Sequence, residues 1–170
     1  MTLEESMAQQ RARGIRVGVL TFGDGRSFLQ EPLREVNQRF LGQLSERLTS
    51  DGFEVITGSE VVWRNDIAVR EGRRLAAEGV DAVIFNFSVW AWPQFARVAA
   101  RFVPQPIVMF SNVNPQYPGL VGMLANAGSL DQVGIPFYKT FGDISDDKVL
   151  ARVRSRLLAV AAANRLRGMT

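Results

Sequence analysis

The sequence contains neither cysteine nor histidine. Without these residues the chain has no thiol nucleophile, no imidazole for acid–base catalysis and no Cys/His zinc site. Any catalysis would have to depend on carboxylates or on groups from another chain segment. A domain of 170 residues buries enough apolar surface to be stable without disulfides or a structural metal.

Lysine is scarce as well: of the 20 basic residues only Lys139 and Lys148 are lysines. The 17 acidic residues leave a formal net charge of +3, and the arginines are spread along predicted helices beside glutamates. Nucleic-acid binding requires basic side chains that cluster on one face. We therefore expect a solvated surface and no nucleic-acid partner.

The sequence also lacks a long apolar run. No segment approaches the ~20 apolar residues that a membrane-spanning helix needs, so we expect no membrane partner. Residues 1–14 are polar and carry acidic residues before basic ones, which is not the layout of a secretory signal. We interpret them as an N-terminal arm before a single domain at 15–170, and we expect the protein in the cytoplasm.

Apolar segments of strand length alternate with segments of helical periodicity. We expect strands at residues 15–22, 53–57, 81–87, 106–110 and 135–140, and helices at 28–51, 67–78, 92–102, 118–132 and 149–166. Most of the strands are continuously apolar, which is typical of a parallel sheet covered on both faces. The pattern predicts an α/β fold, a three-layer α/β/α sandwich with a five-stranded parallel doubly wound (flavodoxin-like) sheet.

In such a sheet, ligands bind beyond the carboxyl ends of the strands. The first of these loops carries Gly23 and Gly25. A dinucleotide fingerprint needs a third glycine at the position of Phe28, and a P-loop needs a lysine at the position of Asp24. The loop therefore matches neither motif. A receiver domain needs an aspartate at the end of the third strand, where this chain has asparagine. We therefore interpret the glycines as a tight turn that presents Asp24 and Arg26.

The loop after the third strand carries two tryptophans, Trp90 and Trp92, close to Asn86 and Ser88. Tryptophan packs on the apolar faces of sugar rings, and amides and hydroxyls bind sugar hydroxyl groups. Packing against a neighbouring helix or subunit is the alternative for both indoles. The loop after the fourth strand adds more amides, among them Asn112. An uncharged polar rim with one arginine suits a neutral polyol better than a phosphate.

Several short segments occur in a characteristic order along the chain. They are DGR at 24–26, FSVWAW at 87–92, FSN at 110–112, GIP at 134–136 and FGD at 141–143. In the order and spacing of these segments the chain resembles the N-terminal domain of the L-fucose isomerase family, which includes the more distant L-arabinose isomerases. The resemblance covers residues 15–168.

The resemblance implies an enzyme that interconverts an aldose and a ketose by proton transfer, with a divalent metal, usually manganese. In that family the metal ligands and the proton-transfer residues lie in later domains. We therefore expect no catalytic residue and no metal ligand in this chain, and no activity of the chain on its own. It would be the first domain of a longer isomerase, closing the monosaccharide pocket of a neighbouring subunit in a homo-oligomer, a hexamer in the family.

By position, the resemblance assigns substrate binding to Arg26 and Trp90, with Asp24, Trp92 and Asn112 as further candidates. The alternative function is one lobe of a periplasmic- or repressor-type sugar-binding protein, because such lobes also carry buried strands followed by polar loops. These lobes are mostly discontinuous in sequence, whereas the strand–helix alternation here is unbroken.

Overall fold

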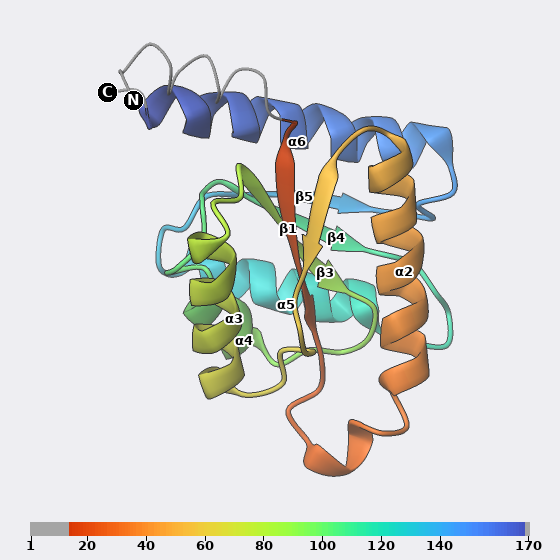
Figure 1. Cartoon of the computed structure of the whole chain (residues 1–170). Coiled ribbons are helices and arrows are strands. Elements are labelled where there is room, and N and C mark those ends of the chain that lie inside the picture. Colours follow the sequence, from red (N-terminus) through yellow and green to blue (C-terminus); the bar gives the residue numbers. More distant parts are fainter. Residues whose placement is uncertain (1–13, 169–170) are drawn as a thin grey trace.

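A five-stranded parallel sheet forms the centre of the protein (Figure 1). In the computed structural model, which describes residues 14–168, the strands lie in the order β2-β1-β3-β4-β5. Their bounds are β1 (Arg16–Phe22), β2 (Glu54–Thr57), β3 (Ala82–Phe87), β4 (Ile107–Ser111) and β5 (Phe137–Phe141). All neighbouring strands are parallel, which confirms the predicted flavodoxin-like sheet. The predicted arm at 1–14 lies, apart from Gly14, outside the described residues.

Helices cover both faces of the sheet. They are η1 (Ser27–Leu29), α2 (Arg34–Ser50), α3 (Asn65–Ala77), α4 (Pro93–Ala99), α5 (Gly119–Asp131) and α6 (Asp147–Arg167). Figure 1 shows α2 on one side of the strands and α3 with α4 on the other, which confirms the three-layer sandwich. Within residues 14–168 no helix combines the length and the apolar character needed to cross a membrane; the cytoplasmic location stays a prediction.

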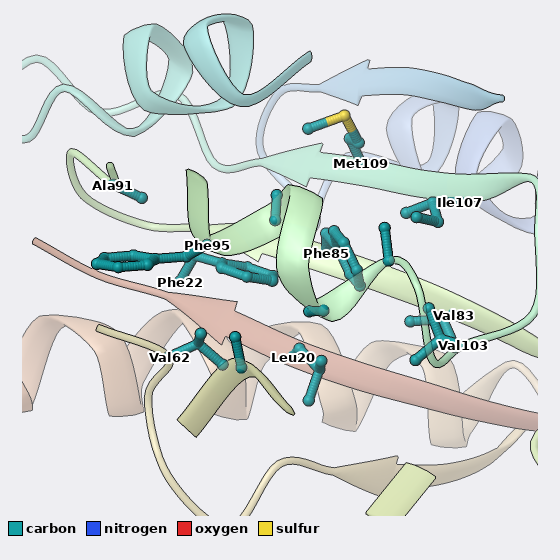
Figure 2. Packing of buried hydrophobic residues seen from close by; sticks show 14 of the residues in the cluster. Leu20, Phe22, Val62, Val83, Phe85, Ala91, Phe95, Val103, Ile107 and Met109 are labelled. Carbon is teal, nitrogen blue, oxygen red and sulfur yellow. The ribbon is translucent and has the colours of Figure 1, made fainter. Parts of the chain in front are cut away.

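The core consists of two apolar clusters, one on each face of the sheet. Successive residues of a strand point to opposite faces, so Leu20 and Phe22 join the cluster under α3, α4 and α5, while Val17 and Val19 join the cluster under α2 and α6. In the first cluster the ring centroid of Phe22 lies 4.7 Å from that of Phe85 (Figure 2). The continuously apolar strands of the sequence are explained by this double coverage.

The predicted helix at 28–51 is wrong at its beginning, because α2 begins only at Arg34. Pro32 has no amide hydrogen to donate to a preceding carbonyl, and its ring disfavours the helical conformation of Glu31. Ser27–Leu29 instead forms the short 3-10 helix η1. Figure 1 shows this segment projecting, in orange, beyond the carboxyl end of β1.

The predicted helix at 92–102 is too long, because α4 ends at Ala99. The amides of Arg101 and Phe102 donate to carbonyls three residues back, so the chain tightens there and leaves the α-helical path. Pro104 follows and disfavours the helical conformation of the residue before it. The ends of the remaining elements agree with the predictions to within two residues.

The first half of α5 packs directly on the backbone that follows β3. A Cβ added to Gly119 would lie 2.5 Å from the carbonyl oxygen of Phe87, and one added to Gly122 would lie 2.8 Å from the amide nitrogen of Ala91. The Asn126 side chain, fully buried, donates from Nδ2 to the Ala91 carbonyl at 3.1 Å. Glycine at two successive turns therefore sets the distance between α5 and this loop.

We predict that Gly122→Ala lowers the free energy of unfolding by about 1–3 kcal/mol, since the new methyl group would meet backbone atoms that cannot rotate away. Gly128→Ala on the same helix is the matched control: its added Cβ meets nothing within 4 Å, and replacing a helical glycine by alanine stabilises by about 0.5–1 kcal/mol. Urea unfolding of both variants measures the two changes. A Gly122→Ala protein as stable as the wild type would contradict the close packing.

Candidate functional site

The crevice of the sheet lies between β1 and β3. The chain leaves β1 toward α2 on one face and leaves β3 toward α4 on the other, so the two loops diverge at the carboxyl edge. Phe22 and Phe87, the last residues of these strands, are partners in the strand register. The segments 23–26 and 88–92 therefore start side by side. In doubly wound sheets, ligands bind at this reversal of strand order.

A buried carboxylate positions an exposed guanidinium in the first of these loops. The Arg26 side chain donates from Nε to Asp24 Oδ1 at 2.8 Å and from Nη2 to Oδ2 at 2.7 Å. The Arg26 amide also donates to Oδ1, at 3.0 Å. Side-chain exposure is 2% for Asp24 and 52% for Arg26. This two-pronged pair fixes the orientation of the guanidinium while leaving half of it accessible.

The pair also keeps Asp24 ionised. Hydrogen bonds from Arg26 hold the pKa of the Asp24 carboxyl below its usual range, and they outweigh the burial of the carboxylate, which acts in the opposite direction. The neighbouring Trp92 side chain lowers this pKa further. Asp24 in turn raises the pKa of Arg26. The loop thus presents a positive group whose charge is already compensated.

Trp92 brings the loop after β3 to the loop after β1. A Cβ added to Gly25 would lie 2.9 Å from Cδ2 of the Trp92 indole, so the ring lies against the backbone of the first loop. The indole is also stacked on Phe95, with ring centroids 6.4 Å apart and planes 7° from parallel. Trp92 nevertheless remains 40% exposed. The structure therefore brings three of the predicted residues, Asp24, Arg26 and Trp92, into one site.

Two residues of this site were missed by sequence reasoning. Gln30 donates from Nε2 to the carbonyls of Asp24 at 2.6 Å and Arg26 at 2.9 Å, and so holds the loop closed. Phe28 is 70% exposed, and the guanidinium carbon of Arg26 lies 5.7 Å from the centre of its ring. The predicted helix at 28–51 included both residues. Pro32 could have indicated that Phe28 and Gln30 precede the helix, because proline interrupts a helix in its interior.

The other two predicted residues, Trp90 and Asn112, form no hydrogen bond or ring contact with Asp24, Arg26 or Trp92 in the described part of the chain. Trp90 is half-buried, and its Cα lies close to Gly122 of α5. Asn112 is only 6% exposed and lines a different cavity of about 590 Å³, together with Phe40 on α2 and Asp143 after β5. The loop after β4 thus lines a cavity with α2 and the segment 143–145, and Arg26 is not among the residues that line it.

Buried hydrogen bonds tie the strand ends beneath the site. Asn86 donates from Nδ2 to Thr21 Oγ1 at 3.1 Å and to Ser88 Oγ at 3.3 Å, which joins the ends of β1 and β3. Ser111 Oγ donates to the Phe87 carbonyl at 2.9 Å and joins β4 to them. Asn86 and Ser88 are fully buried, so they support the loops from below and are not placed to bind a ligand.

Residues 14–168 offer no set of ligands that fits a metal ion. Within residues 14–168 no three carboxylates come together in a way that could hold one, and the sequence has no histidine or cysteine to complete a ligand set. In the candidate site the buried carboxylate, Asp24, already accepts three hydrogen bonds from Arg26.

The fold and the site define a doubly wound α/β domain that presents an arginine and a tryptophan at its switch point. The family of the L-fucose isomerase first N-terminal domain matches residues 14–169, nearly the whole chain. The chain belongs to this family, and the resemblance noted in the sequence is confirmed. No curated protein is similar enough to count as a match.

We predict that Asp24→Asn lowers the free energy of unfolding by about 1–2 kcal/mol at neutral pH, since it removes the charge that Arg26 binds. The half-exposed guanidinium keeps the loss below that of a fully buried pair. The folded carboxyl has the lower pKa, so this contribution is complete above the unfolded pKa of about 4 and disappears as the pH falls through the folded value. Urea unfolding at a series of pH values measures it.

Asp66→Asn provides the matched control. Asp66 accepts the same two-pronged pair from Arg64, two residues away in the chain, but its side chain is 63% exposed. Its replacement should change stability much less than that of Asp24, because solvent screens the pair. Equal losses in the two variants would show that burial of Asp24 contributes nothing.

Proposed function

We propose that this chain is the substrate-closing first domain of a longer, metal-dependent aldose–ketose isomerase that acts on a neutral monosaccharide. The observation that carries the proposal is the Asp24–Arg26 pair beside Trp92 at the switch point, in a chain of the L-fucose isomerase family. Family membership also supports an isomerase over the alternative, a lobe of a sugar-binding protein.

The chemistry of Arg26 supports a neutral ligand. Two of its N–H groups are taken by Asp24, and a guanidinium has about five donors in a planar fork, so others remain for a ligand. The fork can reach two neighbouring hydroxyl oxygens of a sugar, which a lysine could not hold with equal security. Because Asp24 already balances its charge, Arg26 has less to offer a phosphate than an unpaired arginine would.

The tryptophans supply the apolar part of the proposed site. Trp92 stands beside the Asp24–Arg26 pair and is 40% exposed, while Trp90 occupies the position that the family resemblance assigns to substrate binding. We assign to these indoles the covering of the apolar face of the sugar ring and the exclusion of water. Arg26 orients the hydroxyl groups, so the contribution of this chain is positioning.

Proton transfer is assigned to residues outside this chain. A general base works best when its pKa lies near the working pH. The carboxylate of the candidate site, Asp24, has a pKa below the usual range and is held by Arg26, so it is a poor base at neutral pH. The divalent metal, the later domains that bind it and the neighbouring subunits of a homo-hexamer belong to the same proposal, and the family resemblance is their support.

In the isomerase that contains this domain, we predict that Arg26→Ala and Trp90→Ala each lower kcat/KM for L-fucose about 5–150-fold. This range corresponds to about 1–3 kcal/mol of lost hydrogen bonds or aromatic contact. Metal content should stay unchanged, because neither residue is a ligand. Steady-state kinetics with L-fucose and D-arabinose, together with metal analysis, measure these effects, and Trp92→Ala shows which indole contributes more.

Arg64→Ala is the control for this experiment. Arg64 forms the same kind of pair, with Asp66, at the beginning of α3. Its loss should leave kcat/KM at the wild-type value. If Arg26→Ala and Trp90→Ala also turn over sugar at the wild-type rate, the chain does not close the sugar pocket.

A further inference from the structure

A cavity separate from the Asp24–Arg26–Trp92 site lies at the carboxyl end of β1, on the side toward β2. It is a cavity of about 410 Å³ between α2 and the segment 58–63, and its lining includes none of Asp24, Arg26 or Trp92. The walls that matter for its chemistry are Gln30, Asn37, Gln38, Leu41, Val61 and Trp63. Its volume is that of a small-molecule site.

Asn37 is the unusual residue of this cavity. It lies on the buried stripe of α2 that continues with Leu44 and Leu48, where an apolar side chain would be the stable choice. Asn37 is only 3% exposed, and its Oδ1 accepts no hydrogen bond from any described residue. That oxygen is enclosed by the protein, so the atom of this amide left for a ligand in the cavity is Nδ2, which also has no partner among the described residues. An amide without partners costs free energy, and its place on this stripe points to a ligand at Nδ2.

Other buried asparagines differ from Asn37 in one respect. Asn86 and Asn126 also have an unpartnered Oδ1, but each donates two hydrogen bonds from Nδ2, one local and one to a distant part of the chain. Neither of them lines the cavity. Their structural role is evident from these bonds, whereas within residues 14–168 no hydrogen bond accounts for the Asn37 side chain.

The rest of the lining favours a neutral ligand with an apolar face. The half-buried Trp63, donating from Nε1 to Glu60 Oε1 at 3.4 Å, forms one wall. The two charged residues at the cavity are already paired: Arg34 with Glu31 at 2.5 Å, and Glu60 with Arg70 at 2.5 Å. No unpaired charge is thus available there for a phosphate or a carboxylate.

We propose that this cavity is a second binding site, for a neutral monosaccharide. A sugar ring offers hydroxyl oxygens that accept from Nδ2 of Asn37, and an apolar face that packs on Trp63. The proposal does not depend on the proposed function, because the residues that carry it are separate from the Asp24–Arg26–Trp92 site.

Gln30 connects the two sites. It lines the cavity, and its Nε2 holds the carbonyls of Asp24 and Arg26. A ligand that accepts a hydrogen bond from Gln30 Nε2 would weaken the bonds from this amide to the Asp24 and Arg26 carbonyls, and so would affect the loop that presents Arg26. Occupation of the cavity is therefore expected to alter the environment of Arg26 without contact between the ligand and that residue.

The test is a titration of the ¹⁵N-labelled 170-residue chain with L-fucose and D-arabinose, followed by NMR. We expect saturable shifts of the Trp63 indole N–H and of the Asn37 side-chain amide, with smaller shifts at Arg26. Asn37→Leu, of similar volume, should weaken binding about tenfold or more while leaving the melting temperature equal or higher. Gln43→Leu, an exposed position on the same helix, is the matched control and should bind like the wild type.

Several results would overturn the proposal. Absence of saturable shifts at Trp63 and Asn37 would do so, as would wild-type affinity of Asn37→Leu. Shifts confined to Arg26 and Trp92 that disappear in Arg26→Ala would place the sugar at the first site alone. Binding of adenosine in preference to both sugars would show that the ligand class is wrong. If Asn37→Leu does not fold, Trp63→Ala provides the same comparison.

Discussion

The close approach of α5 to the backbone after β3 is the constraint on which the candidate site depends. Gly119 and Gly122 leave no room for a side chain between the helix and the Phe87–Ala91 backbone, and Asn126 bonds to the Ala91 carbonyl. Contacts between backbone atoms cannot adjust as side-chain contacts can. The path of this loop, and with it the positions of both tryptophans, is therefore set by the helix behind it.

That path determines the geometry of the first loop as well. Trp92 emerges where its indole lies against Gly25, and the indole with Phe95 forms a wall beside the Asp24–Arg26 pair. Asp24, buried at the base of this wall, orients Arg26 outward. A guanidinium held in place in this way loses little conformational freedom when it binds a ligand, which favours affinity.

Much of the fold could be predicted from the sequence, because a strand that is covered on both faces is continuously apolar. A glycine also follows each of the first two predicted helices, and these residues, Gly52 and Gly79, have positive φ of 93° and 64°, as is common just past a helix end. The effect of Pro32 was overlooked, and with it the exposure of Phe28. At the site, the loop positions were predictable from the strand order. The grouping of residues was not, since it depends on which face each loop follows, and Asn112 turns toward α2.

The strands β1 and β3 change from apolar to polar residues along their length on one face only. Toward α2 and α6, β1 has valine at its amino end and Thr21 near its carboxyl end, and β3 changes from Ile84 to Asn86. Toward α3 and α5, both strands stay apolar to their last residues, Phe22 and Phe87. Polar groups in a core weaken it unless they are hydrogen-bonded, and conflicts of this kind concentrate at functional sites. Thr21 and Asn86 are hydrogen-bonded to each other and so support the strand ends. Asn37 on α2 faces the same edge without such a partner, which is why the second binding site is proposed there.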